Sequence, residues 1–187
     1  MNEQNNIPER GNFLVSEPFL SDPYFKRSVV LLSEHNEEGT IGFILNKPTD
    51  ISVNEAIRDF PQIESKLYFG GPVQTDSLQY IHTLGMRLEG SREIMNGVYW
   101  GGNFEVLKSM IDTGQVKPSE IRFFVGYSGW QPSQLDTEVK EKSWIIAPGN
   151  FQFAFFDNPK KLWGDVLRSL GKEFSILANF PEDPSLN

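Results

Sequence analysis

Residues 126–130 read Gly-Tyr-Ser-Gly-Trp, and this segment is the part of the chain most like a nucleophile turn. An apolar, strand-like run precedes it and would present Ser128 on a glycine turn. The nucleophile elbow of α/β-hydrolases needs Gly-x-Ser-x-Gly, and its catalytic residues follow in the order serine, acid, histidine. Here Gly129 comes one residue too early, and both histidines, His35 and His82, precede the serine. The spacing therefore predicts a structural turn, and no residue is predicted to be catalytic.

The two histidines are also expected to be structural. His82 alternates with Leu78 and Tyr80, a strand pattern typical of a half-buried histidine hydrogen-bonded to its surroundings, and His35 is expected in a solvated turn. Neither histidine belongs to a His-x-x-x-His pattern or a carboxylate cluster, so no metal site is predicted. The absence of cysteine excludes disulfides, thiolate catalysis and cysteine-ligated metals.

Two glycine pairs, Gly70-Gly71 and Gly101-Gly102, occupy positions where phosphate-binding loops occur. Neither has the spacing of a Walker loop or of a dinucleotide fingerprint. Pro72 also removes one N–H from any anion-binding nest after the first pair. We therefore expect a close backbone approach at the first pair and ordinary capping of a helix by Asn103 after the second. No cofactor is predicted.

A further set of residues could bind a partner. Asn46-Lys47 ends a predicted strand, and it would form a polar contact site if it converged with the first glycine pair. The exposure of Trp130 decides between two interpretations. A buried Trp130 would anchor the core, which we favour, whereas an exposed Trp130 beside Tyr127 would suit a binding hot spot. The candidate interaction groove comprises Asn46, Lys47, Gly70, Gly71, Tyr127 and Trp130.

The composition favours a single globular domain. The chain has 187 residues, with 15 Phe, 5 Tyr and 4 Trp, so it can bury a sizeable core. Its net charge is −8, which disfavours direct nucleic-acid binding because such binding normally needs a basic patch. No apolar run approaches the ~18 residues of a membrane span, so no membrane contact is predicted. The N-terminus lacks the regions of a signal peptide, and a cytoplasmic location is expected.

Hydrophobic periodicity predicts more strands than helices. Strands are expected over residues 13–15, 28–33, 40–45, 67–69, 78–84, 94–95, 98–100, 121–127, 144–147 and 151–156. Helices are expected over residues 53–60 after a Ser52 capping box, 104–111 after Asn103 with Gly114 beyond its end, around 135–139, and from Pro159 to Leu170 after Asn158.

Turn residues predict how these strands connect. The segment 35–39 predicts a hairpin between two apolar strands, and Asn96-Gly97 predicts another. Strict alternation of strand and helix is absent, so an α+β fold is favoured over a Rossmann-type sheet. One domain is expected over residues 11–180, with a loose N-terminus at 1–10 and a disordered tail at 181–187.

The ordered set of segments resembles the YqgE/AlgH family over residues 11–171. The matching segments are Gly11–Val15, Phe25–Leu32, Gly42–Pro48, Tyr68–Val73, Gly126–Trp130, Gln134–Asp136, Trp144 and Leu162-Trp163. The family often has arginine where this chain has Lys47, which keeps the charge but loses the planar fork, and glutamate where it has Asp136.

The resemblance implies a mixed β-sheet with a small β-barrel-like core and flanking helices. One member of the family is named for the regulation of alginate production, and the family is often labelled as transcriptional regulators. No catalytic residue is established for it. The chain is therefore predicted to be a non-catalytic regulatory or interaction protein with a protein partner. Two alternatives stay open: an enzyme with an unfamiliar site around Ser128, His82 and Asn46, and direct DNA binding.

Overall fold

The computed structural model describes residues 7–181. The predicted loose segment 1–10 and tail 181–187 therefore lie mostly outside the described residues. Within the first of these segments, Pro8 is buried, and the amide of Glu9 donates a hydrogen bond of 3.0 Å to Oδ1 of Asn12.

Ten strands form one sheet within the described residues. They are β1 (Phe13–Ser16), β2 (Val29–Asn36), β3 (Gly39–Ile44), β4 (Pro48–Ser52), β5 (Lys66–Phe69), β6 (Val73–His82), β7 (Arg92–Met95), β8 (Val98–Trp100), β9 (Ile121–Trp130) and β10 (Trp144–Ala147). The main path runs β10-β1-β2-β3-β9-β6-β8-β7, and β5 joins β9 and carries β4. All pairs are antiparallel except β5 with β9.

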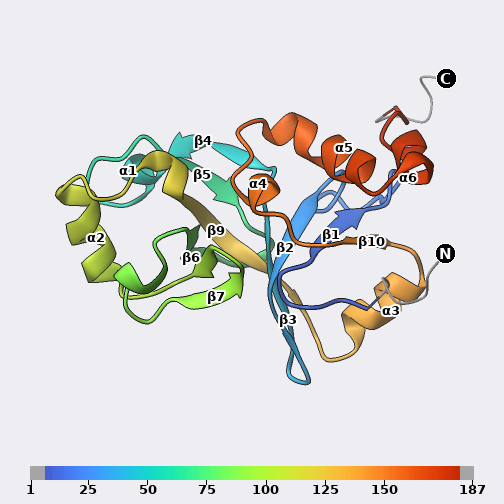
Figure 1. Ribbon diagram of the computed structural model, residues 1–187, viewed down its shortest axis with the longest axis horizontal. Helices are drawn as coiled ribbons and strands as arrows, with labels where there is room; N and C mark the ends of the chain where they lie inside the picture. The colour runs from blue at the N-terminus through green and yellow to red at the C-terminus, as the bar shows by residue number, and fades with distance from the viewer. Residues whose placement is uncertain (1–6, 182–187) are drawn as a thin grey trace.

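Strand β9 holds the sheet together because it has three partners. Its C-terminal end pairs with β3 and its middle pairs in parallel with β5, while β6 pairs along its other side. Figure 1 shows β9 crossing the centre of the molecule, from the side that carries α1 and α2 towards the side that carries α3.

The predicted β-barrel-like core is wrong. Strands β10 and β7 end the path and pair only with β1 and β8, so the sheet does not close on itself. The strand path continues from β9 through β3 towards β10 on one side and through β6 towards β7 on the other. Different helices lie near these two ends of the sheet, α2 near the β7 end and α3 and α5 near the β10 end (Figure 1). The coarser prediction, a mixed sheet with flanking helices, is confirmed.

Six α-helices lie among the described residues. They are α1 (Val53–Ala56), α2 (Phe104–Asp112), α3 (Gln134–Lys140), α4 (Phe151–Ala154), α5 (Pro159–Ser169) and α6 (Lys172–Leu177). Helix α6 is not among the predicted helices, and the helix predicted to reach Phe60 ends at Ala56, although its Ser52 capping box is present. The side-chain Nδ2 of Asn54 donates to the carbonyls of Phe60 and Pro61, and its Oδ1 accepts from the backbone N–H of Ile63. These bonds hold the segment after α1 as a loop.

The predicted strand over residues 151–156 is also wrong. Its first part is helix α4, because the Asn150 side chain accepts a hydrogen bond of 2.9 Å from the Gln152 amide and caps it. Both predicted hairpins are confirmed. Strands β2 and β3 meet at Asn36 and Gly39, and β7 and β8 are connected through Gly97, which has a φ of 79°.

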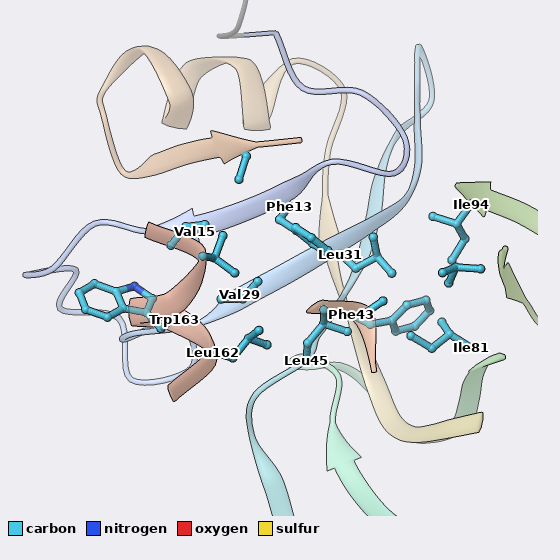
Figure 2. Close-up of a cluster of buried hydrophobic side chains, with 14 of the residues drawn as sticks. Phe13, Val15, Val29, Leu31, Phe43, Leu45, Ile81, Ile94, Leu162 and Trp163 are labelled. Carbon is cyan, nitrogen blue, oxygen red and sulfur yellow. The ribbon is translucent and has the colours of Figure 1, made fainter. Parts of the chain in front are cut away.

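The central strands are buried on both faces. Consecutive β9 residues illustrate this, since Phe123 belongs to a cluster with α1 and α2 while Phe124 belongs to a cluster under α5. Figure 2 shows the second cluster, in which Val15, Val29 and Leu45 lie near the Leu162 and Trp163 side chains of α5, and Phe43 and Ile81 lie on the side away from α5. The Trp163 indole on α5 also donates a hydrogen bond of 3.0 Å to the Ser16 carbonyl. Burial on both faces explains why these strands read as continuous apolar runs.

The caps of α2 and α5 give a matched test of this fold. The Asn103 side chain accepts from the amides of Glu105 and Val106, whereas Asn158 caps α5 without a side-chain hydrogen bond. We expect Asn103→Ala to lower the free energy of unfolding by about 1 kcal/mol, and Asn158→Ala to leave it nearly unchanged. Urea denaturation of both variants measures the difference, and equal losses would contradict the assigned caps.

Candidate functional site

Ser128 lies inside the sheet and not on a turn. Strand β9 continues through it to Trp130, so the predicted turn is wrong, and the backbone instead kinks at Gly126, where φ is 65°. The serine is fully buried, and its hydroxyl donates a hydrogen bond of 3.0 Å to the Gly70 carbonyl. This hydrogen bond joins β9 to the segment that contains Gly70, so the hydroxyl has a structural role.

His82 is fully buried and hydrogen-bonded to the main chain. Nδ1 accepts from the Leu84 amide at 3.2 Å, which places the ring proton on Nε2, and Nε2 donates to the Gly101 carbonyl at 2.8 Å. Burial lowers the pKa of His82, and the bond to Gly101 only partly offsets this effect. The predicted structural role is confirmed, and burial is more complete than expected.

The three residues of the enzyme alternative are not brought together. His82 pairs with Ile121 at one end of β9, whereas Ser128 lies near the other end. At about 3.3 Å per residue the separation is roughly 20 Å, far beyond the hydrogen-bond reach that a base needs. Asn46 is engaged elsewhere, since Oδ1 accepts from the Val29 amide and Nδ2 donates to the Arg27 carbonyl.

His35 likewise differs from its predicted place in a turn. It lies in β2, and its Nδ1 is 2.7 Å from the Thr40 hydroxyl. Among residues 7–181, no three His, Asp or Glu side chains are grouped to hold a metal ion. Over the same part of the chain, every helix is too short or too polar to cross a membrane.

Lys47 and the first glycine pair have structural contacts. The Lys47 ammonium donates to the Pro23 and Tyr24 carbonyls at 3.2 and 2.6 Å, and burial lowers its pKa, while Asp22 acts in the opposite direction. The expected close backbone approach at Gly70-Gly71 is confirmed. A Cβ on Gly70 would lie 2.3 Å from the Gly126 carbonyl oxygen, and one on Gly71 would lie 2.4 Å from the Ser128 amide nitrogen.

Tyr127 and Trp130 line a common cavity of about 290 Å³ beside the turn end of the β2–β3 hairpin. Trp130 is only 5% exposed, and its indole N–H donates to Glu138 at 2.8 Å, so it anchors the core as we favoured. The other lining residues are Glu34, Asn36, Glu38, Gly39, Thr40, Ile41, Val73, Gly129 and Gln131. Of the six residues in the candidate groove, only Tyr127 and Trp130 contribute to this cavity.

A second cavity, of about 320 Å³, involves no residue of the predicted groove. It lies where β5 and β9 run in parallel, and Arg122 lines it although that residue is only 6% exposed. The guanidinium donates to the carbonyls of Leu45 and Phe156 at 3.1 and 2.9 Å and lies 4.6 Å from the centre of the Tyr68 ring. One signal was available in the sequence, because Arg122 is the single charge in the apolar run 121–125.

The sequence profile of the AlgH-like family matches residues 13–175. The chain belongs to this family. The match includes every strand and all but the last two residues of α6. The predicted YqgE/AlgH resemblance is therefore confirmed.

Relatives of similar length support the same family. A UPF0301 protein of Chlorobaculum tepidum is 44% identical over 187 residues, with all of both chains covered. A UPF0301 protein of Cytophaga hutchinsonii is 45% identical over 179 residues, covering 95% of this chain and 98% of its own.

Two solved structures share the AlgH-like fold. A crystal structure of a Corynebacterium diphtheriae protein matches with a TM-score of 0.79 at 27% identity and covers 94% of both chains. The solution structure of the AlgH protein from Pseudomonas aeruginosa matches with a TM-score of 0.72 at 28% identity, covering 92% of this chain and 94% of its own.

The buried His82 predicts a pH dependence of stability. Its pKa is lowered in the folded state, so the unfolded chain binds the proton more readily. Stability should therefore fall as the pH drops below about 6.5, with a slope of at most ~1.4 kcal/mol per pH unit, and level off below the folded-state pKa. Denaturation between pH 7 and 5 should show a flatter profile for His82→Gln than for wild type. His35→Gln is the control, and an unchanged slope in His82→Gln would refute this assignment.

Two glycines of this region provide a steric test. Neither Gly70 nor Gly129 has a left-handed backbone, but a Cβ on Gly129 would meet only side-chain atoms, at 3.4 Å or more. We expect Gly70→Ala to lower the free energy of unfolding by about 3 kcal/mol or more, and Gly129→Ala by less than about 1 kcal/mol. Thermal melts of the two variants test this, and similar melting temperatures would exclude the close approach.

Proposed function

We propose that this AlgH-like chain is a non-catalytic interaction protein and that the cavity beside Tyr127 is its contact surface. The main support for this proposal is that the side chains of Ser128 and His82 are buried and hydrogen-bonded to main-chain groups. Both groups are engaged, and His82 in β6 lies opposite Ile121, about 20 Å along β9 from Ser128, so the chain is better suited to surface recognition than to acid–base chemistry.

The composition of the Tyr127 cavity supports contact with a protein. Ile41, Val73 and Tyr127 supply apolar and aromatic walls, and the carboxylates of Glu34 and Glu38 lie around them. Such a cavity suits a basic side chain flanked by apolar residues, because the carboxylates complement its charge while the ring packs on its stem. Tyrosine is also enriched among residues that dominate binding energy.

In this proposal, the other residues of the predicted groove support the structure next to the Tyr127 cavity. Gly70 and Gly71 pack directly on the strand that carries Tyr127, so they fix the position of its backbone. Lys47 is held by two carbonyls, and the neighbouring Tyr24 stacks on Phe69 with ring centres 5.7 Å apart. We place the principal contact at the Tyr127 end, because two of the three donors of Lys47 are engaged within the chain.

We also propose that the regulatory role implied by the family resemblance is exerted through protein contact. A net charge of −8 repels the phosphate backbone, whereas it favours approach of a basic protein surface. Steep salt dependence of DNA binding at nanomolar affinity would favour the DNA-binding alternative instead.

Substitutions at the two ends of the groove test the proposal. We expect Tyr127→Ala to reduce recovery of a reproducible partner in quantitative affinity capture by about tenfold or more, the scale of a binding hot spot. The double substitution Glu34→Gln with Glu38→Gln should weaken it through loss of charge alone. Lys47→Ala should retain most of the partner.

Phe151→Ala serves as the matched aromatic control, because Phe151 is 48% exposed and lines a different part of the surface. Thermal melts establish that each variant is folded before capture. Equal recovery by wild type and Tyr127→Ala, or loss only in Lys47→Ala, would count against the Tyr127 cavity.

A further inference from the structure

Arg122 is a buried cation without a contacting anion. It is 6% exposed, and none of the carboxylates in residues 7–181 lies within ion-pair distance of its guanidinium. Its two hydrogen bonds go to neutral carbonyls, and the guanidinium has more N–H donors than these carbonyls use. A buried charge is normally paired with an opposite charge. The unused N–H donors and the positive charge of Arg122 are therefore available to bind an anion.

A second cation lies beside it. Strands β5 and β9 pair in parallel with Leu67 opposite Phe123, and the same register one residue earlier places Lys66 opposite Arg122. Side chains at opposing positions project from the same face of a sheet, so the two positive groups are neighbours. Lys66 is exposed and makes no ion pair within the part of the chain that the structure describes.

Both cations open onto the same cavity. Its volume of about 320 Å³ is at the lower end of the range for small-molecule sites. Hydroxyls of Ser65, Ser119 and Tyr68 also line it, and Phe155 provides an apolar wall. The cavity therefore combines convergent hydrogen-bonding groups, a rigid buried guanidinium and a restricted volume.

We propose that this cavity binds the carboxylate of a small organic acid, held between Arg122 and Lys66. The guanidinium is held in place by two main-chain carbonyls and the Tyr68 ring, so its side chain loses little conformational entropy when the anion binds. Arginine suits carboxylates because its planar fork matches their geometry. This site lies apart from the Tyr127 cavity and does not depend on the proposed protein contact.

Two acidic residues of the cavity limit the negative charge of the ligand. Glu64 and Asp157 line it as well; burial lowers the pKa of Arg122, and the charges of Tyr68 and Asp157 act in the opposite direction. A dianion would be repelled by both carboxylates, whereas a monocarboxylate meets mainly the two cations. The net charge of −8 likewise disfavours an extended acidic partner.

Acetate is the simplest probe of the site. We expect saturable changes in the NMR signals of the Arg122 side chain and the Lys66 and Tyr68 amides when acetate is added at constant ionic strength. Chloride should not produce them. Changes that are linear in acetate and matched by chloride would overturn the proposal.

Charge substitutions then assign the binding to these residues. Lys66→Gln should weaken acetate binding about threefold or more and leave the fold intact, because Lys66 is exposed, and Arg122→Lys should weaken it about tenfold by losing the planar fork. Lys140→Gln, on the exposed face of α3, is the matched control. If Arg122→Lys fails to fold, Lys66→Gln decides alone. Wild-type affinity in Lys66→Gln would overturn the proposal.

Discussion

Strand β9 pairs with three other strands, and these pairings join both ends of the sheet. One ten-residue strand provides hydrogen bonds to β3, β5 and β6, and it buries side chains on both faces. Because Phe123 and Phe124 enter different cores, a shift of β9 by one residue would move each of its side chains to the opposite face and into a core with the wrong shape. The glycines at positions 70 and 71 belong to the same constraint, since only they allow the neighbouring backbone to approach β9 this closely.

This constraint separates the residues that could do chemistry from the surfaces that could recognise a ligand. The hydroxyl of Ser128 in β9 and the imidazole of His82 in β6 are used within the sheet, and His82 lies opposite the far end of β9 from Ser128. The two cavities instead occupy opposite ends of β9, one beside Tyr127 and the other beside Arg122. A single strand thus contributes residues to an acidic, aromatic surface and to a site that contains two cations.

Local features of the fold were predictable from the sequence, and non-local ones were less so. The Asn96-Gly97 hairpin and the Asn103 cap depend on adjacent residues, and both are found as predicted. The strand predicted over 151–156 fails because Asn150 caps a helix, a side-chain bond that outweighs the β propensity of the phenylalanines. The barrel expectation came from resemblance, and sheet closure depends on distant pairings of β9 that no local pattern encodes.

The candidate sites show the same division. Sequence alone indicated that Trp130 would be buried and that His82 would be hydrogen-bonded, because such residues in apolar strands need partners for their N–H groups. It could not place Lys66 beside Arg122, since these residues are far apart in sequence and meet only through the parallel register.

The late position of β9 in the chain also affects synthesis on the ribosome. Strands β3, β5 and β6 are all translated before Ile121–Trp130, so the edge of each that pairs with β9 has no partner until β9 has been made. The nascent chain therefore cannot complete its sheet until most of it has been made, and its open edges are exposed to aggregation or to chaperones during that interval.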